Sequence, residues 1–183
     1  MSQRTMNVLS NFLLFQIGWF SCVWSAAAKR PWIGVLVTVG VVVIHLFRAP
    51  MPKKELQLIL LALGIGLLFD SLLVVQGWLK YSSGNVAPNL APYWIVALWG
   101  LFATILNVSL RWMRGRWITA ALFGALGGPA AYYGGLRLGA LEFGNMEAGL
   151  AALAIGWAVL TPLLLALSVR FDGQAGRLET VTV

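Results

Sequence analysis

The sequence contains very little charge, and this is its most informative property. Only 10% of its 183 residues are Asp, Glu, Lys or Arg, whereas soluble domains carry about 25%. Hydrophobic residues make up 60% of the chain, and its mean hydropathy is +0.82. Water is therefore not the main solvent of this protein. No polar stretch is long enough to form a separate soluble domain, so we predict a single transmembrane domain over residues 1–183.

Cysteine and histidine each occur once, as Cys22 and His45. One cysteine cannot form an internal disulfide, and one histidine cannot build a multi-histidine metal site. The sequence also has no Gly-x-Ser-x-Gly elbow and no glycine loop that would cradle a phosphate. We therefore predict no metal and no cofactor. An enzymatic function is disfavoured but stays open, and no catalytic residue is assigned.

Long apolar segments are what the chain has in abundance. A helix needs about 20 residues to cross a hydrocarbon core of roughly 30 Å. Six segments meet or approach that length: residues 8–28, 32–47, 56–79, 93–113, 117–136 and 148–169. The first also resembles a secretory signal, but its length and its polar residues Asn11 and Gln16 favour a retained helix. We predict an all-α, polytopic membrane helix bundle with about six transmembrane helices.

Lys and Arg are distributed unequally between the two predicted sides of the membrane. With the N-terminus inside, the inner set is Arg4, Arg48, Lys53, Lys54, Arg111, Arg114, Arg116, Arg170 and Arg177; the outer set is Lys29, Arg30, Lys80 and Arg137. This bias predicts that both termini face the cytoplasm, as in a multi-pass protein of the bacterial inner membrane. The net charge of +7 then reflects contact with anionic membrane lipids, and nucleic acid is not an expected partner.

Asp70 is the strongest candidate for a functional residue. It lies about nine residues from the outer end of its predicted helix, near the bilayer midplane. A charged side chain there costs at least about 2.5–3.5 kcal/mol, so it should face the bundle interior with a partner or a proton. Gly66 and Gly77 share its helical face and would let another backbone approach. Gln16 lies at a similar depth and is the predicted partner; a functional role and a purely structural hydrogen bond remain equal alternatives.

A second polar group gathers near the predicted cytoplasmic side. Asn11, His45, Asn107 and Arg111 lie within a few turns of that interface on three different helices. This grouping predicts an inner-leaflet pocket in which Arg111 meets a phosphate or carboxylate headgroup. The alternative is that Arg111 snorkels to the interface, as a terminal arginine of any membrane helix does. Both interpretations stay open.

The predicted helix 117–136 is rich in small residues and has Gly127-Gly128-Pro129 in its middle. Small residues let membrane helices pack closely, and proline removes a backbone donor and favours a kink. Tyr132 follows the proline and is a further candidate for ligand binding. The default explanation for Tyr132 and Tyr133 is nevertheless aromatic anchoring at the outer interface.

Several of these residues occur together in a known family. The motifs are Asn11, Phe15-Gln16-Ile17-Gly18-Trp19-Phe20, His45, Asp70, Pro92-Tyr93-Trp94 with Leu98-Trp99, the run from Gly127 to Gly135, and Gly139-Ala140. In combination they resemble the bacterial inner-membrane family catalogued as domain of unknown function 2878, from about Asn11 to Val169. The resemblance implies no activity and no catalytic residue. It does imply an association with lipid-modification gene clusters, which makes a lipid-related role worth testing.

Three classes of function follow from these residues. A carrier or binder of a lipid-like or apolar small molecule would use Asp70 and Gln16 at mid-depth. An accessory or scaffold subunit of a membrane lipid-modifying system would use glycine stripes to hold a membrane-protein partner or a second copy. A membrane-embedded acid/base enzyme would use Asp70 or Glu142. A partly polar cavity that reaches Asp70 would favour the carrier or the enzyme, and a tightly packed interior would favour the scaffold.

Overall fold

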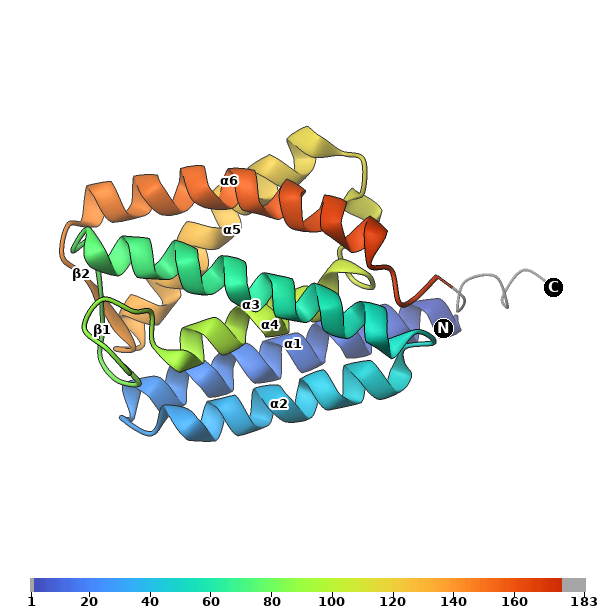
Figure 1. Cartoon of the computed structure of the whole chain (residues 1–183), viewed down its shortest axis with the longest axis horizontal. Coiled ribbons are helices and arrows are strands. Elements are labelled where there is room, and N and C mark those ends of the chain that lie inside the picture. Colours follow the sequence, from blue (N-terminus) through green and yellow to red (C-terminus); the bar gives the residue numbers. More distant parts are fainter. Residues whose placement is uncertain (1, 176–183) are drawn as a thin grey trace.

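The computed structural model describes residues 2–175 and consists mainly of six α-helices (Figure 1). The helices are α1 (Gln3–Ala27), α2 (Pro31–Arg48), α3 (Pro52–Val75), α4 (Tyr93–Leu106), α5 (Trp117–Arg137) and α6 (Met146–Arg170). A short 3-10 helix, η1 (Arg111–Met113), follows α4. Two short strands, β1 (Leu79–Tyr81) and β2 (Leu141–Phe143), pair antiparallel. The predicted all-α helix bundle is therefore confirmed, with a small sheet that the sequence did not predict.

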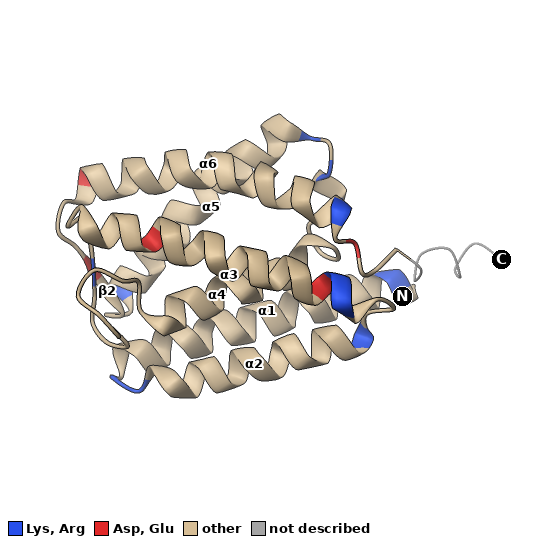
Figure 2. Ribbon diagram, viewed as in Figure 1, with Lys and Arg blue, Asp and Glu red and all other residues tan. Residues whose placement is uncertain are grey.

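Successive helices run in opposite directions, so α1 begins and α6 ends at the same end of the bundle (Figure 1). We call this the terminal end, and we call the opposite end, where β1 and β2 pair, the sheet end. Most of the Lys and Arg residues gather at the terminal end (Figure 2). Arg177, a member of the predicted inner set, lies outside the described residues. The two ends thus differ in charge as the sequence predicts.

Four helices of the described region, α1, α2, α3 and α6, are long and apolar enough to cross a membrane. α5 has 21 residues but is not among these four, because its glycines, proline and tyrosines lower its hydropathy. α4 has only 14 residues, fewer than the roughly 20 that a crossing requires. Ten of those 14 residues are buried, so α4 is a central helix of the bundle and is largely shielded from lipid.

The predicted fourth helix, residues 93–113, is too long. α4 ends at Leu106 because the Ile105 carbonyl accepts hydrogen bonds from the N–H groups of both Val108 and Leu110, which closes the last turn. The side chain of Asn107 then points to other elements, where it donates to Glu55 and to the Phe171 carbonyl. Hydropathy continues past this turn, so it gave no sign of the helix end.

The buried face of α3 contains two carboxylates (Figure 2). Glu55, Ile59, Ala62, Gly66 and Asp70 are all buried and recur at spacings of four and three residues, which places them on one face of the helix. At 1.5 Å per residue, the two carboxylates lie about 22 Å apart along α3. The helix predicted from the sequence begins at residue 56 and so excludes Glu55. Because α3 begins at Pro52, Glu55 is part of this helix, and its side chain faces the interior of the bundle.

α5 and α6 pack closely through the glycines of α5. A Cβ atom on Gly124 would lie 2.1 Å from the Trp157 carbonyl oxygen, and one on Gly128 would lie 2.3 Å from Trp157 Cγ. The small-residue face therefore allows the close helix packing that the sequence predicts. α5 continues as one helix through Pro129, so the proline does not divide it into two.

The contact at Gly124 leads to a prediction. Gly124→Ala should destabilise the protein by about 1–3 kcal/mol, because a backbone oxygen cannot move aside for the new methyl group without separating the helices. Gly127→Ala is the matched control, since its Cβ would meet nothing nearer than 4.0 Å. The measurement is the thermal unfolding midpoint of the purified protein in detergent. Equal midpoints for the two variants would contradict the close approach of α5 to α6.

Candidate functional site

Asp70 is completely buried and accepts three hydrogen bonds. Its Oδ1 accepts from the hydroxyls of Tyr81 at 2.7 Å and Tyr132 at 2.6 Å, and its Oδ2 accepts from Trp99 Nε1 at 2.6 Å. These donors belong to β1, α5 and α4, so the carboxyl connects three elements to α3. No Lys, Arg or His within residues 2–175 forms an ion pair with Asp70. We call Asp70, Tyr81, Trp99 and Tyr132 the aspartate cluster.

Gly66 creates the space that Trp99 needs beside Asp70. A Cβ atom at Gly66 would lie 2.0 Å from Trp99 Cγ, so only glycine lets the indole lie against α3. The predicted close approach at Gly66 is thus real, but the partner is a side chain and not a backbone. Gly77 is not on the face of Asp70, because α3 ends at Val75 and Gly77 lies in the following turn with a φ of 68°.

The predicted hydrogen bond between Gln16 and Asp70 is absent from the described part of the chain. α4 packs against both α1 and α3, and its Trp99 takes the place next to Asp70 that was expected for Gln16. The pairing was predicted from depth alone, and depth does not determine which helices are neighbours. Tyr132 is not an exposed interfacial anchor, which was its default explanation. Its side chain is buried in the aspartate cluster, while the adjacent Tyr133 is 44% exposed.

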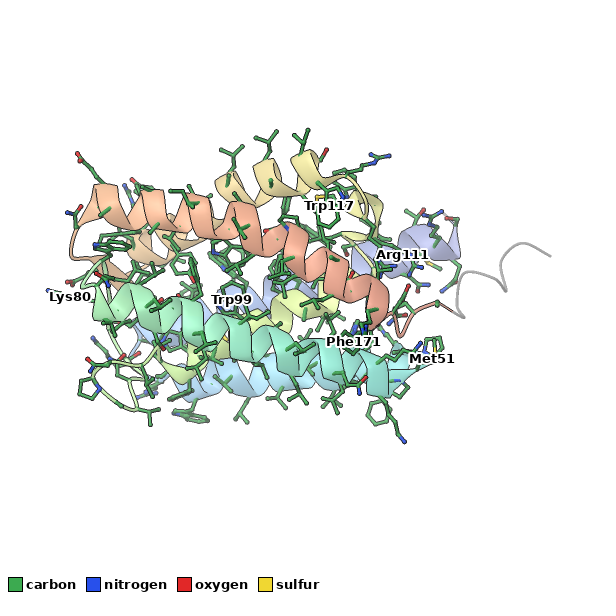
Figure 3. All side chains as sticks on the ribbon, turned by 45° about the horizontal axis from the view of Figure 1, so that its top comes forward. Met51, Lys80, Trp99, Arg111, Trp117 and Phe171 are labelled. Carbon is green, nitrogen blue, oxygen red and sulfur yellow. The ribbon has the colours of Figure 1, made fainter. Side chains whose placement is uncertain are left out.

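A cavity of about 310 Å³ lies beside the aspartate cluster, and we call it the lateral cavity. Trp99 and Tyr132 line it, whereas Asp70 does not. Figure 3 shows Trp99 in the interior of the bundle. The aromatic lining residues are Phe12, Phe15, Trp19, Trp94, Trp99, Phe102, Phe123, Tyr132 and Trp157. The walls are therefore mainly apolar. Asp70 affects the cavity through its hydrogen bonds to Trp99 and Tyr132.

The lateral cavity opens sideways. Two of its lining residues, Phe12 of α1 and Phe123 of α5, are 46% and 43% exposed, and the exposed Gly127 lies one turn after Phe123. These residues place the mouth between α1 and α5, on the flank of the bundle and away from its two ends. In a membrane this flank faces the hydrocarbon region. Gln16 also lines the cavity and supplies a polar group there.

Two residues of α6 that line the lateral cavity have a buried polar atom without a described partner. Trp157 Nε1 and Thr161 Oγ1 have no hydrogen-bond partner within residues 2–175, and both residues belong to the lining. Trp157 stacks on Trp99, with the ring centres 4.5 Å apart and the planes 16° apart. The wall of the cavity therefore continues from the Asp70-bound Trp99 to α6.

A second polar cluster surrounds Glu55 near the terminal end. Glu55 is completely buried, and its Oε2 lies 2.7 Å from His45 Nε2. Its Oε1 accepts hydrogen bonds from Asn107 Nδ2 at 2.6 Å and from the Gly173 N–H at 2.8 Å. This carboxylate therefore joins α2, the segment after α4 and the segment after α6 to α3.

The four polar residues predicted near the cytoplasmic side line one cavity of about 420 Å³, which we call the terminal cavity. Its full lining is Gln3, Arg4, Asn7, Val8, Ser10, Asn11, Leu14, Val41, His45, Arg48, Asn107, Val108, Ser109, Arg111, Trp112 and Gln174. The structure thus brings Asn11, His45, Asn107 and Arg111 together. Asn11 Nδ2 donates to the Thr104 carbonyl, which connects α1 to α4.

Arg111 does not extend freely toward the interface, because Asp172 holds it. Arg111 Nη2 and Arg114 Nη1 lie 2.9 and 2.8 Å from Asp172 Oδ2. Burial of this carboxyl raises its pKa, but hydrogen bonds from Arg114 and the Gln174 backbone, with the charges of both arginines, outweigh that effect. The pKa of Asp172 therefore lies below its ordinary value. Arg114 also donates to Asn107 Oδ1.

Sequence reasoning missed Glu55, Tyr81 and Trp99 as members of these clusters. Glu55 had a detectable signal, since it continues the helical spacing of Ile59, Ala62, Gly66 and Asp70. Tyr81 and Trp99 had none. They come from a strand and from another helix, and only the packing of those elements on α3 brings them to Asp70.

These observations define the class of protein: a membrane-type helix bundle with a buried carboxylate near each end of α3, with the lateral and terminal cavities beside these groups. The chain belongs to the family described as Protein of unknown function (DUF2878), whose model matches residues 8–163. This match confirms the resemblance inferred from the sequence, and it includes all four residues of the aspartate cluster. Comparisons with curated proteins and with solved structures found no match.

Proposed function

We propose that this protein binds or carries a lipid-like, apolar small molecule in the lateral cavity. The observation that carries the proposal is the cavity itself: about 310 Å³, walled mainly by aromatic residues, and open on the flank of the bundle. Small-molecule sites are typically concave and mostly apolar, with a few polar groups that orient the ligand. A tightly packed interior would have supported the scaffold function instead.

Asp70 has a positioning role in this proposal. It does not line the cavity, but its hydrogen bonds fix the side chains of Trp99 and Tyr132, which do. Gln16, which lines the cavity, is the polar residue that would contact the ligand. Since Asp70 does not reach the cavity, it is poorly placed to exchange a proton with a ligand there, and the geometry favours binding over acid/base chemistry.

We also propose that the protein resides in the bacterial inner membrane with the terminal end in the cytoplasm. The excess of Lys and Arg at that end supports this orientation (Figure 2). The mouth of the lateral cavity would then face the acyl chains, so an apolar ligand could enter directly from the bilayer. Such a route requires no passage through water, in which the ligand is poorly soluble.

Tryptophan fluorescence can test ligand binding, because four of the nine tryptophans, Trp19, Trp94, Trp99 and Trp157, line the lateral cavity. A brominated long-chain alkane, titrated into the purified protein in detergent, should quench the fluorescence saturably. Gly127→Phe places a ring at the mouth and should weaken the apparent affinity at least about tenfold, equivalent to about 1.4 kcal/mol.

Gly127→Ala is the matched control, because its methyl group would come no nearer than 4.0 Å to a neighbouring atom, Phe123 Cε1, and it should bind like the wild type. Equal, non-saturating quenching of all three proteins would show only partition of the probe into the micelle. That result would overturn the binding proposal. It would favour the scaffold alternative, in which the protein holds a membrane-protein partner or a second copy.

A further inference from the structure

The terminal cavity has a strongly basic lining. Arg4, Arg48 and Arg111 contribute guanidinium groups from three different segments of the chain. Arg4 lies in the first turn of α1, and Arg48 is the last residue of α2. Both are thus placed at the level where the headgroups of a bilayer begin. This cavity is separate from the lateral cavity, because the two share no lining residue.

The positive charge of this region is only partly neutralised. Arg111 and Arg114 share the single carboxylate of Asp172, and the carboxylate of Glu55 is enclosed by His45, Asn107 and the Gly173 N–H. Neither Arg4 nor Arg48 forms an ion pair with a carboxylate of the described residues. Arg4 and Arg48 therefore bring two positive charges that no carboxylate of residues 2–175 neutralises.

Arg48 is also positioned across the cavity. Its Nη1 lies 3.4 Å from Ser10 Oγ, so the side chain of the last residue of α2 reaches α1. Asn7 and Asn11 of α1 line the same space and add amide groups. A planar guanidinium recognises phosphate oxygens by paired hydrogen bonds. The arrangement is suited to an anion with several oxygens.

We propose that the terminal cavity binds a phosphate group, with Arg4 and Arg48 as the residues that contact it. The group belongs either to the headgroup of an anionic lipid or to a soluble phosphate compound. The chemistry is the same in both cases. Arg111 has a different role, because its guanidinium group is already paired with Asp172.

The test is the thermal unfolding midpoint of the purified full-length chain in detergent, titrated with three separate additives. These are mixed micelles containing phosphatidylglycerol, mixed micelles containing phosphatidylcholine, and inorganic phosphate. Phosphatidylglycerol should raise the midpoint more than phosphatidylcholine, because it has a net negative charge. In the double variant Arg4→Gln/Arg48→Gln the apparent affinity for phosphatidylglycerol should fall about tenfold or more.

Arg116→Gln/Arg170→Gln is the matched control. It removes the same two charges at the terminal end, from exposed arginines that do not line the cavity, and it should respond like the wild type. Arg4 and Arg48 are exposed as well, so the double variant should unfold at the wild-type temperature without additive. If it does not, Arg4→Lys/Arg48→Lys keeps the charge and should restore the midpoint, and it should restore only part of the lipid response, because lysine cannot make the paired hydrogen bonds of a guanidinium group.

The additives distinguish the two sources of the phosphate. Stabilisation by inorganic phosphate alone, lost in the double variant, would identify a soluble phosphate compound, and stabilisation only by phosphatidylglycerol would identify a lipid headgroup. An equal loss of lipid response in Arg4→Gln/Arg48→Gln and in Arg116→Gln/Arg170→Gln would overturn the proposal, since it would show general attraction to a basic surface. No preference for phosphatidylglycerol or phosphate in the wild type would overturn it too.

Discussion

Glu55→Ala should destabilise this protein by about 3–5 kcal/mol, as expected when one partner of a buried, hydrogen-bonded charge cluster is removed. The carboxylate of Glu55 is completely buried and is in contact with His45, Asn107 and the Gly173 N–H. Alanine removes every one of these hydrogen bonds and leaves a space that water reaches poorly. The segments after α4 and α6 would lose their common attachment to α3.

The measurement for Glu55 is the thermal unfolding midpoint in detergent, with Glu147→Ala as the control. Glu147 lies in the exposed first turn of α6, so its loss should change the midpoint little. Glu55→Gln should fall between the wild type and Glu55→Ala, because its amide oxygen can still accept from the Gly173 N–H. A midpoint of Glu55→Ala equal to that of Glu147→Ala would show that the cluster contributes nothing to stability.

Asp70→Ala should have the second large effect, about 3 kcal/mol or more, because it leaves three buried donors without an acceptor. Asp70→Asn should be milder. The asparagine oxygen can accept from Trp99, and its NH2 group can donate to a tyrosine hydroxyl, since a hydroxyl accepts as well as donates. The difference between the two variants therefore measures the hydrogen bonds of the aspartate cluster separately from the charge of Asp70.

A double-mutant cycle with Trp99→Phe checks this explanation. If the Trp99 N–H depends on Asp70, the effects of Asp70→Ala and Trp99→Phe should be less than additive by about 0.5–3 kcal/mol. Fully additive effects would show that the 2.6 Å contact between these side chains is energetically irrelevant. Quenching by the brominated alkane should also weaken in Asp70→Ala, because Trp99 and Tyr132 would no longer be fixed beside the lateral cavity.

The class of the protein and most of its helices follow from hydropathy, which is a property of each segment by itself. Five of the six predicted segments correspond to helices with ends that differ by a few residues, as for residues 32–47 and α2 (Pro31–Arg48). The exception is residues 93–113, since a turn within apolar sequence does not change its hydropathy. The buried, inward-facing position of Asp70 was predictable for the same local reason: a carboxyl within an apolar helix must avoid lipid. Its predicted depth was less accurate, because α3 ends at Val75 and Asp70 lies five residues from that end, not nine.

The partners of Asp70 were not predictable from the sequence. Depth in the membrane suggested Gln16, but the insertion of α4 between α1 and α3 gave that place to Trp99. The polar residues near the terminal end were predicted only in part. Asn11, His45, Asn107 and Arg111 were grouped correctly by their shared depth, while Glu55 and Asp172, the carboxylates that organise them, were not recognised.

The sequence by itself determined that this chain is a membrane-type bundle of about six long helices and that Asp70 is buried within it. Those properties depend on the transfer of single segments from water to hydrocarbon. Only the tertiary structure decided which faces meet, and therefore which donors surround Asp70 and Glu55 and where the two cavities lie. Helix faces associate through close contacts between residues far apart in sequence, such as Gly66 with Trp99, and no local pattern encodes such a pair.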